Sequence, residues 1–91
     1  MNNKIIIKYL ENLVLSRFTI KEFETKIKSD FNLTEFSISK NDIEALNDTD
    51  DSFIFSIELK QLLIDVTMYY IYTNKKDTFL VTEVSYEFEV L

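Results

Sequence analysis

The spacing of apolar residues changes once along this chain, from three and four positions near the start to two positions in the second half. Between about residues 3 and 16, apolar side chains recur at helical spacing, which predicts a first helix. These side chains are Ile6, Leu10, Leu13 and Val14. From Phe53 onward, apolar residues fall on every second position, as in a strand that buries one face. The pattern therefore predicts an α+β fold with helices first and strands last.

A second helix has the clearest start signal in the chain. Thr19 is followed three residues later by Glu22, which is the spacing of a capping box. Phe18 and Phe23 stand at the two positions of a hydrophobic staple around that cap. One face of the segment behind them is apolar, so we predict a helix over about residues 20–31.

A weaker copy of this start follows around Ser39, with Ile38 before it and Ile43 after it. It predicts a short helix over residues 40–47, preceded by an extended piece at 34–38. The polar run at 47–52 then reads as a loop.

Three strands are predicted at about 52–60, 62–73 and 78–90, joined as an antiparallel meander. Opposed residues must share a face, so the parity of Leu59 and Leu62 requires a two-residue turn between them. The same rule gives a three-residue turn at 75–77. The resulting register pairs Ile57 with Ile64, Phe55 with Val66, Phe53 with Met68, Asp65 with Glu87, Leu63 with Glu89, and Tyr69 with Glu83. We expect both helices to pack on this sheet in one domain of residues 1–91.

Missing residue types exclude several kinds of chemistry. The chain has no Gly, Pro, Cys or His, so it contains neither a phosphate-binding glycine loop nor a histidine or cysteine catalytic site. Residues 48–52 resemble the start of a calcium loop, but Phe53 stands where that loop needs glycine and Leu59 where it needs an acid. We expect no enzymatic activity, no metal and no cofactor. The early apolar run is too short for a membrane span or signal peptide, which favours a cytoplasmic protein.

Charge is unevenly distributed along the chain, whose net charge is -6. Residues 1–45 hold seven basic and seven acidic residues, whereas residues 46–91 hold three basic and nine acidic residues. This balance disfavours direct nucleic-acid binding. The order of helices and strands also fits a winged helix, but its recognition segment at 39–46 has one lysine and two acids, so DNA reading is the less favoured interpretation.

One face of the predicted meander points away from the strand residues that form the core. It carries Asp65, Glu83, Glu87 and Glu89 with no basic residue on those strands, and in the predicted register also Tyr69, Ile71, Phe79 and Val81 near its other end. Such a face is either hydrated and covered in part by the helices, or it binds a cationic partner.

The most favoured function is therefore non-catalytic binding of a protein with a basic surface. Ile, Asn, Lys, Phe and Tyr make up 40 of the 91 residues, a bias of A/T-rich genes that is typical of low-GC bacteria, their phages and their plasmids. We predict an inhibitor or regulator that blocks a nucleic-acid-handling protein, in the manner of anti-CRISPR and anti-restriction proteins. An immunity or antitoxin-like partner of a basic toxin, and a homo-oligomeric subunit, are the alternatives. The predicted contact residues are Asp48, Asp50, Asp51, Asp65, Glu83, Glu87, Glu89, Tyr69 and Phe79.

Overall fold

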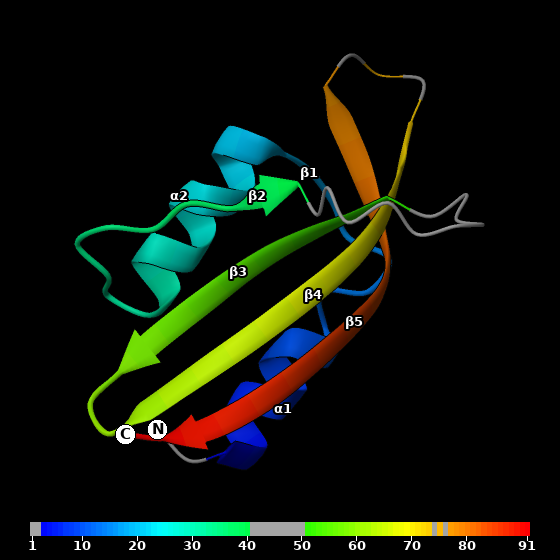
Figure 1. Ribbon diagram of the computed structural model, residues 1–91. Coiled ribbons are helices and arrows are strands. Elements are labelled where there is room, and N and C mark those ends of the chain that lie inside the picture. The colour runs from blue at the N-terminus through cyan, green and yellow to red at the C-terminus, as the bar shows by residue number, and fades with distance from the viewer. Residues whose placement is uncertain (1–2, 41–50, 74, 76) are drawn as a thin grey trace.

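The computed structural model describes residues 3–40, 51–73, 75 and 77–91. Within these ranges the chain forms two helices and one five-stranded antiparallel sheet (Figure 1). The elements, in chain order, are α1 (Asn3–Glu11), β1 (Arg17–Thr19), α2 (Ile20–Asp30), β2 (Ser39–Lys40), β3 (Asp51–Leu59), β4 (Leu62–Tyr72) and β5 (Thr78–Val90). The strand order across the sheet is β1-β5-β4-β3-β2. The predicted α+β class is thus confirmed, and the sheet gains two short strands that the sequence pattern did not predict.

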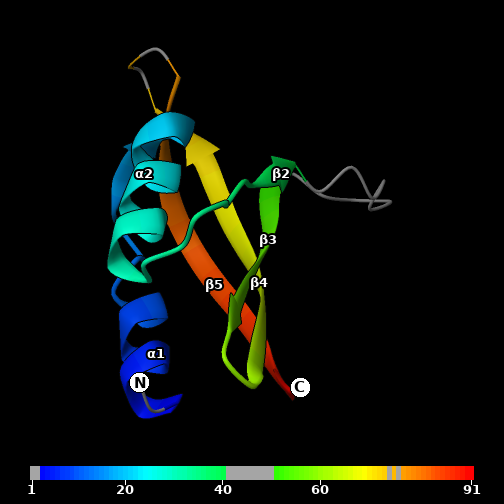
Figure 2. The ribbon, with the colours of Figure 1, turned by 90° about the vertical axis from the view of Figure 1, so that its left-hand side faces the viewer.

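The helices and the sheet form two layers. Figure 2 shows α1 and α2 on the same side of the sheet, so they share one buried face with β3, β4 and β5. The aromatic ring of Phe23 on α2 lies at the centre of this core, 5.5 Å from the ring of Phe55 and 6.3 Å from that of Phe79. The fully buried side chains are Ile6, Leu10, Phe23, Ile27, Phe53, Ile57, Ile64, Met68, Tyr70, Phe79 and Val81.

Helix α1 ends at Glu11, earlier than the predicted residue 16. The reason lies in the sheet, because the Leu15 N–H donates to the Val81 carbonyl at 2.8 Å and the Val81 N–H donates to the Ser16 carbonyl at 3.0 Å. These two bonds draw the chain into β1. The apolar stripe continues, since Leu13 is still buried, but it continues outside the helix.

Helix α2 begins where its start signal predicts. The Thr19 hydroxyl accepts from the Glu22 N–H at 3.1 Å, and the Glu22 carboxylate accepts from the Thr19 N–H at 3.0 Å. The rings of Phe18 and Phe23 lie 5.4 Å apart, as a hydrophobic staple requires. The capping box and the staple are both confirmed.

The segment after α2 departs from its prediction. Ser39 and Lys40 form β2 and pair with Ile54 and Phe53, so the helix predicted from residue 40 is wrong at its first residue. Residues 41–47 lie outside the described ranges. Before β2, the Ile38 N–H donates to the Glu24 carboxylate at 3.0 Å, which ties the connection to α2.

The predicted register of β3 with β4 is confirmed along the whole hairpin. Leu59 faces Leu62 across the turn Lys60-Gln61, and Phe53 faces Met68 near the other end. Gln61 adopts a φ of 67°, which closes the turn without glycine.

The predicted register of β4 with β5 is confirmed from Leu63 opposite Glu89 to Tyr69 opposite Glu83. It then shifts, because Tyr70 faces Val81 and leaves Thr82 as an extra residue in β5. This β-bulge reverses the side-chain alternation beyond it. Phe79 and Val81 therefore lie in the core, each with 0 % exposure, and the prediction that they point outward is wrong.

The bulge also changes the connection from β4 to β5. The Thr73 N–H donates to the Thr78 carbonyl at 3.0 Å, so Thr73 is opposite Thr78. The predicted three-residue turn at 75–77 is wrong, because an extra residue in β5 changes the parity on which it depends.

No helix in the described part of the chain is long and apolar enough to cross a membrane.

Candidate functional site

We call the side of the sheet opposite the helices the outer face. It carries alternate side chains of β3, β4 and β5, and neither described helix packs on it (Figure 2). Its residues are Ser52, Ile54, Ser56 and Glu58 of β3, Leu63, Asp65, Thr67, Tyr69 and Ile71 of β4, and Leu80, Glu83, Ser85, Glu87 and Glu89 of β5. Those of β3 and β5 are exposed apart from the buried Ser52 and the half-buried Leu80, whereas those of the central strand β4 up to Tyr69 are half-buried between their neighbours.

Carboxylates are arranged in rows across this face. Asp65 lies between Ser56 and Glu87, and Leu63 lies between Glu58 and Glu89. The three strands carry no lysine or arginine. Within the described ranges, no basic side chain approaches these carboxylates to ion-pair distance. The ion pair in that part of the chain lies on α2, between Lys26 and Asp30. All charged side chains that β3, β4 and β5 place on the outer face are thus negative.

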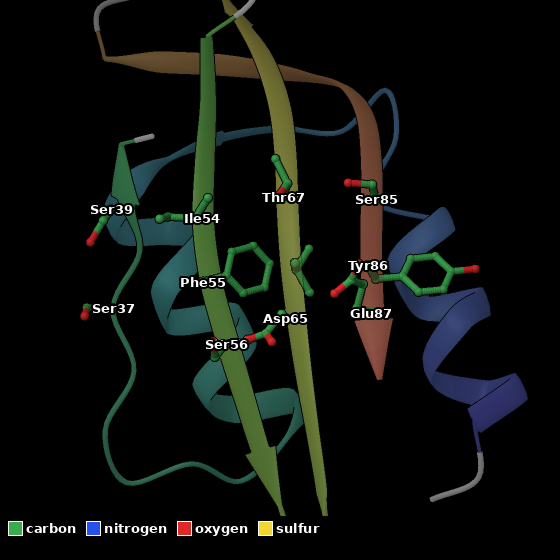
Figure 3. Close-up of a pocket in the computed structure, with 11 residues that line it drawn as sticks. Ser37, Ser39, Ile54, Phe55, Ser56, Asp65, Thr67, Ser85, Tyr86 and Glu87 are labelled. Carbon is green, nitrogen blue, oxygen red and sulfur yellow. Dashed lines mark hydrogen bonds between the residues drawn. The ribbon is translucent and has the colours of Figure 1, made fainter. Parts of the chain in front are cut away.

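A hollow of about 630 Å³ opens on the outer face (Figure 3). It runs from the segment before β2 across β3 and β4 to β5. Its polar lining consists of the carboxylates of Asp65 and Glu87 and the hydroxyls of Ser37, Ser39, Ser56, Thr67 and Ser85. Figure 3 shows Asp65 and Glu87 projecting from adjacent strands into the same space.

The hydrogen bonding in the hollow fixes one of the two carboxylates. The Ser56 hydroxyl donates to the Asp65 carboxylate at 2.7 Å, across the β3–β4 pair. Glu87 stands opposite Asp65 on β5 and is exposed. Two like charges in directly opposed positions repel each other, and a cation placed between them turns this repulsion into attraction. The site can therefore hold an ammonium or guanidinium group, with hydroxyls available as further partners.

The predicted contact residues do not all meet at this site. Asp65, Tyr69, Glu83, Glu87 and Glu89 share the outer face. Phe79 does not, because it is buried among the core aromatic rings. Asp48 and Asp50 lie outside the described ranges.

Asp51 is exposed but belongs to the other face of the sheet. It shares the parity of the core residue Phe53 and lies opposite Tyr70. Burial raises the pKa of the Tyr70 phenol, and the neighbouring Tyr72 and the negative charge of Asp51 raise it further. Asp51 therefore stands apart from the outer-face carboxylates.

The predicted contact residues did not include Glu58, Ser56, Thr67 and Ser85. Glu58 occupies an outward position of β3, and the confirmed register of that strand would have placed it beside Leu63. The hydroxyl residues also occupy outward positions, but no sequence signal shows that they border a hollow, because its depth depends on the curl of the sheet and on Ser37 and Ser39.

Comparison of the chain with protein-family models, with curated proteins and with solved structures finds no match. The function must therefore be argued from the outer face itself.

Proposed function

We propose that this protein binds another protein through the outer face of its sheet, and that the partner presents lysine or arginine side chains. The observation that carries this proposal is the concentration of Glu58, Asp65, Glu83, Glu87 and Glu89 on one face of three strands that contain no basic residue. Exposed carboxylates of one sign attract an oppositely charged surface from a distance and orient it.

The hollow supports the same proposal at short range. Arginine recognises carboxylates through two parallel hydrogen bonds, and the opposed pair of Asp65 and Glu87 offers acceptors on adjacent strands. The hydroxyl groups around them can accept hydrogen bonds from further N–H groups of the partner. Binding by these groups requires no chemical step.

The partner class that we favour is a protein with a basic nucleic-acid-binding groove, which the carboxylates would occupy in place of phosphates. The protein would then act as an inhibitor or regulator, comparable to anti-CRISPR and anti-restriction proteins. A basic toxin would meet the same surface by the same chemistry, and identification of the captured partner separates the two.

The test is a pair of variants with the same change in net charge. Glu83→Lys/Glu87→Lys alters the outer face, whereas Glu11→Lys/Asn12→Lys/Thr25→Lys, which raises the net charge by the same amount, alters exposed positions within and just after the helices. We expect the first variant to lose the partner captured from host lysate by the wild type, and the second to retain it. The association rate of the wild type should fall as salt rises, because exposed charges are screened within about 10 Å at 0.1 M ionic strength. Equal capture by both variants, with unchanged kinetics, would show that the outer face is not the binding surface.

A further inference from the structure

Strand β5 has a long open edge. It pairs with β1 only through Thr78, Phe79 and Leu80, and with the chain just before β1 through Val81. From residue 82 to residue 90, its edge away from β4 has no strand beside it in the described part of the chain. In Figure 1 this stretch of β5 forms the border of the sheet. An open edge of this kind is a template for pairing with another chain.

The hydrogen-bond pattern identifies which backbone groups the edge presents. The Leu91 N–H donates to the Gln61 carbonyl at 3.1 Å, so residue 91 points its backbone groups toward β4. In an antiparallel pair this direction alternates from residue to residue. The N–H and C=O groups of Val84, Tyr86, Phe88 and Val90 therefore point away from β4, and no described residue forms a backbone hydrogen bond with them.

The side chains of the edge alternate in character. Glu83, Glu87 and Glu89 stand exposed on the outer face, whereas Val84, Tyr86 and Phe88 are half-buried on the core face. A strand added here would place every second side chain beside the carboxylates and the others beside the apolar row.

We propose that the β5 edge from residue 82 to 90 binds an extended, antiparallel segment of a partner protein in which lysine or arginine alternates with apolar residues. This inference rests on the proposed function and specifies how the partner is held. Backbone hydrogen bonds contribute affinity for any extended segment, and Glu83, Glu87 and Glu89 select a segment with basic side chains.

A second copy of this chain is a poor occupant of the same edge. Two β5 strands paired antiparallel about Tyr86 would bring Glu83 opposite Glu89 of the other copy, twice over. Like charges in opposed positions destabilise a strand pair. The charges thus favour a basic strand over self-association.

The open part of β3 is less suited to this role. Strand β2 occupies the β3 edge at Phe53 and Ile54, and the stretch between β2 and the turn to β4, residues 55–59, has no described strand beside it on that side. One carboxylate, that of Glu58, lies on this stretch, compared with three on the open part of β5.

The inference can be tested with a nine-residue peptide of alternating valine and lysine. In the proposed arrangement the valine N–H groups face β5 and the lysine N–H groups face solvent, because opposed residues of an antiparallel pair share a face. N-methylation of the valines should therefore weaken binding at least about tenfold, since several intermolecular hydrogen bonds are lost. N-methylation of the lysines, with the same composition and charge, should leave the affinity within a factor of about two.

Amide hydrogen exchange gives an independent measurement on the unaltered protein. Peptide binding should slow exchange at Val84, Tyr86 and Phe88, whose N–H groups face the open edge. The N–H groups of Ser85 and Glu87 already point toward β4 and should change little.

A protein variant completes the test. Val84→Pro removes an N–H group that β4 does not use, whereas Val84→Ala shortens the side chain and keeps that group. We expect the proline variant to lose peptide binding and the alanine variant to retain it, with far-UV circular dichroism confirming that both fold. The peptide experiments with wild-type protein decide the matter if the proline variant is unfolded.

The outcomes separate this inference from the proposed function. Equal, salt-sensitive binding of both N-methylated peptides would overturn strand addition and leave charge recognition intact, and selective weakening by lysine methylation would overturn the antiparallel arrangement. Absence of peptide binding, together with unchanged capture by Glu83→Lys/Glu87→Lys, would overturn both proposals. Concentration-dependent dimerisation through β5 would show that the occupant is a second copy.

Discussion

Four residues other than glycine adopt positive φ in the described part of this glycine-free chain. They are Leu15 at 70°, Asn32 at 54°, Gln61 at 67° and Asp77 at 60°. Asn and Asp tolerate this region because their short polar side chains bond locally, whereas Leu and Gln lie there at a cost of roughly 1–2 kcal/mol per residue. Backbone hydrogen bonds offset part of this strain, since the Leu15 N–H donates to the Val81 carbonyl and the Gln61 carbonyl accepts from the Leu91 N–H.

Gln61→Gly should stabilise the protein by about 0.5–1 kcal/mol. Relief of the positive-φ strain exceeds the added entropy of the unfolded chain at this site. Lys60→Gly is the matched control, because Lys60 lies in the same turn without positive φ and its replacement should destabilise. Urea midpoints of the two variants and the wild type provide the measurement, and a lower midpoint for Gln61→Gly would refute the strain argument.

Some of these conformations could be anticipated from the sequence and others could not. The tolerance of Asp77 for positive φ follows from its side chain. Leu15 carries no such signal, because its conformation is imposed by the hydrogen bond from its N–H to the Val81 carbonyl, 66 positions along the chain.

Among the elements, α2 depends on its capping box. Thr19→Ala should lower the free energy of unfolding by about 1 kcal/mol, because the Glu22 N–H then loses its side-chain acceptor. Thr25→Ala, at an exposed position inside the same helix, is the control and should raise stability by up to about 0.7 kcal/mol, because alanine favours the helix more than threonine does. Equal chemical-denaturation midpoints for Thr19→Ala and the wild type would show that the cap adds nothing.

The capping box should also respond to pH. The hydrogen bond from the Thr19 N–H, and then that with the Thr19 side chain, hold the pKa of Glu22 below its usual range. A carboxyl group with a lowered folded-state pKa stabilises the protein above its unfolded pKa and loses that contribution as pH falls through the folded value. The difference in midpoint between Glu22→Gln and the wild type should therefore be smaller at pH 3 than at pH 7.

Strand β5 shows where sequence reasoning at this scale fails. Its register with β4 is predictable from parity as far as Glu83, and is wrong beyond the bulge at Thr82. The sequence did contain one sign of the bulge. If the alternation of β5 is continued past Glu83, the apolar side chains of Phe79 and Val81 point to solvent and only that of Leu80 points into the core. Burial of Phe79 and Val81 outweighs the disruption of the ladder, so the strand gains a bulge.

At the scale of the whole molecule, the core depends on β5 beyond the bulge. Phe79→Ala should cost about 3–5 kcal/mol, because a fully buried ring in contact with Phe53 and Tyr70 is removed. Ile71→Ala is the control, since that side chain is 47 % exposed and should cost much less. Urea denaturation of both variants measures the difference, and equal midpoints would mean that Phe79 is exposed as the unbulged register predicts.

The outer face could be predicted in its charge and in much of its membership. The period of two, with the parity of Leu59 and Leu62, placed Asp65, Tyr69, Glu83, Glu87 and Glu89 correctly. The hollow and the open edge could not be predicted, because both depend on which strands lie beside β3 and β5. Those neighbours are β2 and β1, which have two and three residues and too little sequence for a recognisable period.

The unpaired border of β5 also affects how the protein behaves when it is concentrated. Exposed strand edges promote precipitation unless something keeps molecules apart, and many proteins place lysine or proline there. This chain uses glutamates at positions 83, 87 and 89 instead. Salt screens that mutual repulsion, so the solubility of the protein is controlled at the same edge that we propose as its binding site.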